Sequence, residues 1–236
     1  WGYAHDGQIL KDVNPAHESD SLTQAKTEVL TDGALLHLRL ASKGITVNID
    51  NNHPFTHGTT TFMHNGTIRP GNTAEQFIAD KYKGFLQGTT DSERFFYALL
   101  SQVDEQLVVI AEAAVPRIER GGIANDQDRD EDDRRPGRGL GRGLGAPAPL
   151  SQIPTSTSIT VLGPDGAVLG GLGGNLGGAS ITSYLAGLLP EEVAVHGDEA
   201  FTIAVPGPDF RVIARPLTSP AGTFVAAQNL GDLERT

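Results

Sequence analysis

The chain has 236 residues, 38% of them hydrophobic, with 29 acidic and 18 basic side chains and a formal net charge of −11. This length and balance predict one large or two small soluble globular domains, and the charge argues against nucleic acid or an anionic membrane face as partner. No apolar run approaches the roughly 20 residues of a membrane-spanning helix, and no export signal is recognisable, so we expect neither. The absence of cysteine excludes disulfides, thiolate metal sites and a cysteine nucleophile from these residues.

The first part of the chain, residues 1–119, has mixed strand and helix patterning. Alternating residues predict a strand from Ala34 to Ala41, and a hairpin is expected around Thr59 to Ile68. Apolar periodicity predicts a helix from Asp91 to about Glu119. These patterns predict a layered domain of helices and strands.

The rest of the chain divides into a linker and a second small domain. Residues 120–154 are first almost all charged and then rich in Gly, Arg, Leu and Pro, which predicts a flexible linker. Residues 155–236 predict a small α+β domain with one short helix near Ile181 to Leu189. Its expected strands are Ser158–Val161, Ala167–Leu169, Phe201–Val205, Phe210–Ala214 and Thr223–Ala227.

His37 and Arg39 alternate with leucines in the first predicted strand, which places the two polar residues on one face and the leucines on the other. An arginine held on a strand beside a cavity can bind a carboxylate through two parallel hydrogen bonds. The alternative is an arginine at the surface with a solvated head group.

His64-Asn65-Gly66 lies between strand-like residues, and Asn-Gly in that setting predicts a hairpin turn. The functional interpretation is that the Asn65 side-chain amide and the Gly66 backbone N–H converge on a developing oxyanion. A tight turn is compatible with both interpretations. The same residues are therefore candidates for a turn and for an oxyanion hole.

Thr90-Asp91-Ser92-Glu93 precedes an apolar run and fits a capping box, in which Thr90 and Glu93 bond each other's backbone N–H. A further hypothesis is that Asp91 binds the ammonium of an amino acid whose carboxylate binds Arg39. Asn51 to Phe55 predicts a loop or sheet edge because it contains Pro54, with His53 as a packing or orienting residue.

Taken together and in this order, the four motifs resemble class II glutamine amidotransferases, which belong to the N-terminal-nucleophile hydrolases. The opening Trp1-Gly2-Tyr3-Ala4 is similar to the family's Asp-Gly-Trp-Gly strand. The resemblance implies an α+β fold with an αββα sandwich, here truncated, and release of ammonia from glutamine without a cofactor. It implies Asn65 and Gly66 as the oxyanion hole, with His37 and His64 as supporting residues. The implied substrate-binding residues are Arg39, Asp91, Ser42 and His53.

In that family a cysteine attacks glutamine, and no cysteine occurs in this sequence. We therefore expect this chain by itself to be inactive, with glutamine or a γ-glutamyl compound as ligand and an ammonia-accepting domain or subunit as partner. A non-catalytic glutamine-binding module is the alternative. No metal is expected, because His53, His57 and His64 lack a supporting carboxylate pattern.

Residues 99–236 have a looser similarity to the extracytoplasmic sensor region of bacterial histidine kinases, carried by segments such as Thr160 to Leu169 and Phe210 to Leu217. The amidotransferase resemblance implies a cytoplasmic protein, whereas the sensor resemblance implies an extracytoplasmic one. A third hypothesis is thus a sensor or ligand-binding module dominated by the second half of the chain.

Overall fold

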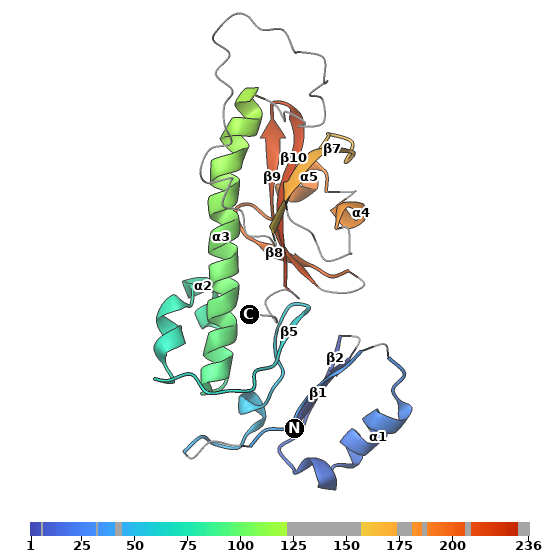
Figure 1. Cartoon of the computed structure of the whole chain (residues 1–236), viewed down its shortest axis with the longest axis vertical. Helices are drawn as coiled ribbons and strands as arrows, with labels where there is room; N and C mark the ends of the chain where they lie inside the picture. Colours follow the sequence, from blue (N-terminus) through green and yellow to red (C-terminus); the bar gives the residue numbers. More distant parts are fainter. Residues whose placement is uncertain are drawn as a thin grey trace, which may run out of the picture. The chain divides into compact units, whose positions relative to one another are not determined.

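The computed structural model describes residues 1–5, 7–31, 33–40, 44–121, 157–173, 181–185, 188–205 and 209–230. The chain divides into two compact units, Trp1–Gln102 and Val103–Thr236, and the long helix α3 (Asp91–Gly121) contributes residues to both (Figure 1). Apart from the end of α3, the predicted linker lies outside the described residues. Within the described ranges, no helix has the length and apolar character needed to cross a membrane.

Unit 1 contains a three-stranded antiparallel sheet in the order β2-β1-β3 and a separate hairpin of β4 and β5. The strands are β1 (Gly2–His5), β2 (Gln8–Lys11), β3 (Leu35–His37), β4 (Phe55–His57) and β5 (Thr60–Phe62). The helical segments before α3 are η1 (Ala16–Glu18), α1 (Asp20–Glu28), η2 (Ile49–Asn51), η3 (Thr73–Phe77) and α2 (Asp80–Lys83). Mixed helices and sheets of this kind are compatible with an amidotransferase domain of the N-terminal-nucleophile type.

Helix α1 packs against β1 through a small apolar cluster. The Ser19 hydroxyl caps the helix by accepting a hydrogen bond from the Leu22 backbone N–H. Leu22 then packs with Tyr3 of β1 and with Trp1, which precedes that strand, in one buried cluster. Gly2 lies between these two aromatic residues, and a Cβ atom there would be 1.6 Å from the carbonyl oxygen of His53. Glycine is therefore required where β1 passes the segment before β4.

The first predicted strand is shorter than expected, and its leucine face is not buried. Strand β3 ends at His37, whose partner in the ladder is Gly2, the first residue of β1. Arg39 thus lies beyond the strand, contrary to the prediction. Leu36, Leu38 and Leu40 are 48%, 60% and 96% exposed because no described element covers that face.

The hairpin in unit 1 is also placed differently from the prediction. Strands β4 and β5 are joined at Gly58-Thr59, and Gly58 adopts a φ of 59°, which favours glycine. The prediction that Asn65-Gly66 forms the turn is wrong, because both residues follow β5. Gly66 is not among the described glycines with positive φ, which a type I′ hairpin turn requires.

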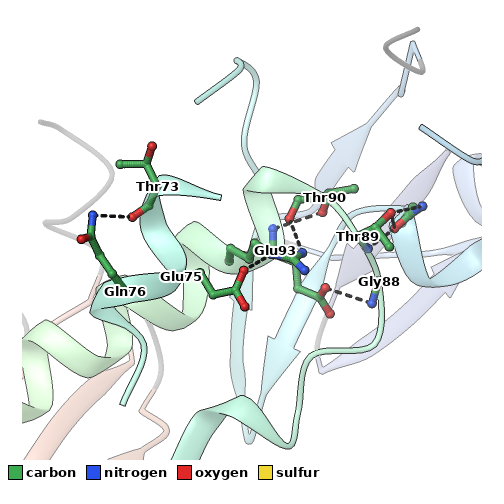
Figure 2. A network of polar contacts seen from close by, with 9 residues as sticks. Thr73, Glu75, Gln76, Gly88, Thr89, Thr90 and Glu93 are labelled. Carbon is green, nitrogen blue, oxygen red and sulfur yellow. Dashed lines mark hydrogen bonds and ion pairs between the residues drawn. The ribbon is translucent and has the colours of Figure 1, made fainter. Parts of the chain in front are cut away.

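The predicted helix from Asp91 is confirmed, while the predicted capping box is only half formed. The Thr90 hydroxyl accepts a hydrogen bond from the Glu93 backbone N–H at 3.2 Å. The buried Glu93 carboxylate does not return to Thr90 and instead accepts a hydrogen bond from the Gly88 N–H at 2.9 Å (Figure 2). It also accepts one from the Gln87 N–H at 2.8 Å. Glu93 therefore fixes the loop that leads into α3.

Unit 2 is built on a five-stranded antiparallel sheet in the order β7-β6-β10-β9-β8. The strands are β6 (Thr157–Leu162), β7 (Val168–Gly173), β8 (Phe201–Ile203), β9 (Phe210–Thr218) and β10 (Ala221–Asn229), and the short helices are α4 (Thr182–Leu185) and α5 (Pro190–Val193). Each strand predicted in this region is present, and β9 and β10 extend beyond the predicted bounds.

Alternate residues of the sheet enter two separate cores. Phe224 and Ala226 of β10 pack with Leu107 of α3, which runs beside β9 and β10 in Figure 1. Val225, between them, packs on the opposite face with Leu185 of α4. This follows from the two-residue side-chain period of a strand. Both faces of the central strands are consequently apolar and covered.

A buried ion pair links α3 to the sheet of unit 2. The Arg211 guanidinium of β9 donates to both carboxylate oxygens of Asp104, at 2.6 and 3.0 Å, and also to the Thr202 hydroxyl at 3.0 Å. Both charged residues are only 4% exposed. The paired geometry compensates for removing the two charges from water.

Candidate functional site

Three histidines of unit 1 connect β3 with the Asn65-Gly66 segment. The Nε2 atom of His37 lies 3.2 Å from the carbonyl oxygen of His64, and because a carbonyl only accepts, the Nε2–H group donates. The ring of His37 packs against that of His53, with centroids 4.0 Å apart and the ring planes tilted by 30°. The predicted supporting pair of His37 and His64 is therefore in direct contact.

His53 is buried in this group in its neutral form. It is 5% exposed, and neither ring nitrogen has a hydrogen-bond partner among the described residues. Burial, with smaller contributions from His37 and His64, lowers the pKa of His53 to about 3. Burial also lowers the pKa of His37. Both imidazoles are hence expected to be neutral at physiological pH.

Arg39 lies at a cavity of about 300 Å³ in unit 1. Its Nη1 donates to the side-chain oxygen of Asn52 at 3.3 Å, and the Asn52 amide nitrogen donates to the carbonyl of Asp12 at 2.8 Å. The residues that line this cavity are Trp1, Val13, Asn14, Pro15, Ala16, Leu38, Arg39, Val47 and Asn52. Partial burial lowers the pKa of Arg39, yet a guanidinium remains charged in proteins. The cavity therefore presents a fixed positive charge.

A second hollow of about 370 Å³ lies along the β1–β2–β3 sheet. Its lining is Ala4, His5, Gly7, Gln8, Ile9, Gly33, Ala34, Leu35 and Thr61. None of the predicted site residues that the structure describes is in this lining. The cavity at Arg39 is the better candidate for a ligand, because a charged side chain lines it and can recognise one.

The Asn65-Gly66 segment is attached to the start of α3 at two points. The Nδ1 atom of His64 is 3.0 Å from the Ser92 hydroxyl. Four residues later, the backbone N–H of Ile68 donates to the Asp91 carboxylate at 2.6 Å. Asn65 and Gly66 lie between these attachments and are exposed. Their polar groups are thus presented on the surface by a loop with both ends held.

The predicted substrate-binding residues do not converge in one cavity. The Asp91 carboxylate accepts hydrogen bonds from the backbone N–H groups of Ile68 and, at 3.0 Å, Ser92. Asp91 is not in the lining of the cavity at Arg39. His53 does not line it either, and Ser42 lies outside the described residues. Among the members of the predicted set that the structure describes, Arg39 alone lines the cavity.

Two residues that contribute to this site were not among the sequence candidates. Asn52 orients Arg39, and Ser92 contacts His64. Both belong to the motifs that predicted the site, Asn51 to Phe55 and Thr90 to Glu93, so their position was a usable signal. Their partners are distant in the sequence, and the contacts therefore required the fold.

Comparison with known proteins agrees with these motifs. The profile of the family "Glutamine amidotransferases class-II" matches residues 1–120. The "Probable glutamine amidotransferase DUG3" of Saccharomyces cerevisiae is 33% identical over 107 residues, which cover 43% of this chain and 30% of that protein. The match thus spans less than a third of the relative's length. No solved structure was found to match the chain.

The family match ends at residue 120, so the sensor-like similarity of the second half stays a prediction. The matched residues include all four motifs of unit 1, from His37 to Glu93. They make up just over half of the sequence. The chain therefore belongs to the class II glutamine amidotransferases.

Proposed function

We propose that unit 1 binds glutamine, or a γ-glutamyl compound with the same amino-acid head group, as the glutamine site of an amidotransferase. In this proposal Arg39 binds the substrate carboxylate, and Asp91 receives the ammonium. The Asn65 side chain and the Gly66 N–H form the oxyanion hole at the γ-carbonyl, with Ser42 and His53 completing the substrate site. The surrounding fold is an αββα sandwich of the N-terminal-nucleophile type.

The carrying observation is the cavity at Arg39. At about 300 Å³ it is at the lower end of small-molecule sites, which suits an amino acid. The hydrogen bond to Asn52 holds the guanidinium in place before a ligand arrives, which reduces the entropy lost on binding. His37 lies two residues before Arg39 and bonds the carbonyl of His64. The cavity and the Asn65-Gly66 segment are therefore linked through this hydrogen bond.

Hydrolysis needs a nucleophile that these residues do not provide. Attack on a carboxamide in this family uses a cysteine thiolate, and the sequence contains no cysteine. We infer that this chain alone binds and orients the substrate without hydrolysing it. Released ammonia would pass to an acceptor on a partner domain or subunit, and we propose a cytoplasmic setting for that transfer.

Isothermal titration calorimetry with glutamine and with glutamate tests the binding step directly. We expect binding by the native chain and a loss of at least tenfold in affinity for Arg39→Ala, since a hydrogen-bonded charge pair contributes about 1.5–3 kcal/mol. Asp91→Asn should weaken binding as well, because it removes the charge while keeping an acceptor for the Ile68 N–H.

Arg94→Ala is the matched control. Arg94 is also an arginine of unit 1, but it pairs with Glu75 at 3.3 Å and does not line the cavity. Its substitution should leave the affinity unchanged. Absence of binding by a folded native chain, or equal losses for Arg39→Ala and Arg94→Ala, would contradict the proposed function.

A further inference from the structure

Ser92 has a buried hydroxyl that helix capping does not explain. It lies in the first turn of α3 and is 4% exposed. The capping role is already filled by Thr90, whose hydroxyl accepts from the Glu93 N–H. The hydrogen bond of Ser92 instead goes to Nδ1 of His64, at 3.0 Å and 28 residues away in sequence.

The ring of His64 is held on several sides by this arrangement. Besides the bond to Ser92, it packs near Phe95 of α3, with centroids 5.8 Å apart, and stacks with Phe62 of β5 at 6.3 Å. This hydrogen bond holds the ring in one orientation for either tautomer, because a serine hydroxyl can donate to Nδ1 or accept from it. The ring therefore has one preferred position relative to α3.

The position of this ring in turn limits the path of the following backbone. A Cβ atom built on Gly66 would lie 2.7 Å from Nε2 of His64, so the ring and the Gly66 backbone are in close contact. The carbonyl of His64 is fixed separately by His37 at 3.2 Å. In a trans peptide the next N–H points opposite to that carbonyl, so the direction of the Asn65 N–H is fixed too.

We propose that Ser92 is a positioning residue for the Asn65-Gly66 segment: its hydroxyl orients the His64 ring, and the ring sets the path of the Gly66 backbone. The effect on substrate rests on the proposed function, in which these two residues face the γ-carbonyl. The positioning itself is a property of the chain without ligand. It assigns a role to the third residue of the Thr90-to-Glu93 motif.

The test is nitrogen-15 NMR of the histidine rings together with the backbone amides of Asn65 and Gly66. In the native chain we expect the Nδ1 signal of His64 to have the shift of a ring nitrogen that is hydrogen-bonded to the Ser92 hydroxyl. Ser92→Ala should move this signal toward that of a freely exchanging imidazole and shift the Gly66 amide. Ser92→Thr keeps the hydroxyl and should retain the native pattern.

Ser101→Ala is the matched control, because Ser101 is a buried serine of the same helix, 5% exposed, that bonds Ala79 and Tyr97 instead of a histidine. It should leave the His64 and Gly66 signals in place. An unchanged Nδ1 signal of His64 and an unchanged Gly66 amide in folded Ser92→Ala would overturn the proposal.

A glutamine titration of the same samples separates this inference from the proposed function. If both hold, Ser92→Ala weakens glutamine binding by about fivefold, the effect of one misplaced hydrogen bond, and Ser92→Thr restores it. If no sample binds glutamine while the His64 Nδ1 signal and the Gly66 amide still depend on the Ser92 hydroxyl, positioning is supported and the proposed function fails.

Discussion

Different interactions hold each of the two units together. Unit 2 has strands of up to nine residues in one five-stranded sheet with an apolar core on each face. Unit 1 has strands of three or four residues, and buried polar side chains hold its loops. The Asn51 side chain, for example, bonds the Thr46 carbonyl and the Thr89 N–H at 2.9 and 2.7 Å. Loops held this way can present functional groups, whereas a sheet core mainly supplies stability.

The largest expected effect is on the apolar core of unit 2. Phe224→Ala should destabilise this unit by about 3–5 kcal/mol, because it removes a fully buried aromatic ring from the central strand. Urea denaturation followed by circular dichroism measures the loss. Val168→Ala, at a residue 46% exposed, should change the stability little. A loss below about 1 kcal/mol for Phe224→Ala would contradict the assigned core.

In unit 1 the next largest effect on stability is expected at the buried Glu93 carboxylate, which holds a loop. Glu93→Gln should cost about 2 kcal/mol, since the carboxylate accepts two backbone N–H groups that one amide oxygen cannot both satisfy equally well. Hydrogen exchange at the amides of Gln87 and Gly88 should speed up. Glu75→Gln, at a half-exposed side chain, is the control. Unchanged exchange at both amides would show that Glu93 does not hold this loop.

His53 predicts how unit 1 responds to acid. The pKa of His53 is about 3 in the folded chain against an ordinary value of 6.5, so the unfolded state binds the proton more readily. The contribution of neutral His53 to the free energy of unfolding is fully present above pH 6.5. It is lost as pH falls toward 3, by about 1.4 kcal/mol per pH unit below about 6. His53→Phe, which keeps a ring, should remove this part of the slope between pH 6.5 and 5. Identical slopes would exclude a buried neutral histidine.

The smallest effect is expected at Leu40, which is 96% exposed. Leu40→Ser should change the stability by less than about 0.5 kcal/mol. Leu22→Ser, at a residue 3% exposed in the α1 cluster, should by contrast be strongly destabilising. Comparable losses in the two variants, measured by urea denaturation, would contradict the exposure of Leu40.

The same contrast explains what the sequence could predict. In the long strands of unit 2 and in the helix starting at Asp91, apolar residues recur at a regular spacing along the whole element. The positions of these elements were predicted correctly. In unit 1 the strands are too short for a pattern to decide. The turn at Gly58-Thr59 therefore replaced the expected one at Asn65-Gly66, although Asn-Gly is the stronger local signal.

Part of the candidate site was accessible from its motifs, and part was not. Arg39 and His64 were identified because their neighbours resemble a known family, which the family match supports. The bonds from Arg39 to Asn52 and from His64 to Ser92 depend on how loops meet, and local propensity carries no information about that. Glu93 is an example in which the motif was recognised and the partner was wrong.

The central claim is that the Arg39 cavity and the Asn65-Gly66 segment form one glutamine site. Titrating the native chain with glutamine while recording backbone amide spectra tests it most directly. The account predicts saturable shifts at Arg39, Asn52, Asn65 and Gly66, with none at Phe224 of unit 2. Saturable shifts confined to unit 2, or none in a folded chain, would contradict it.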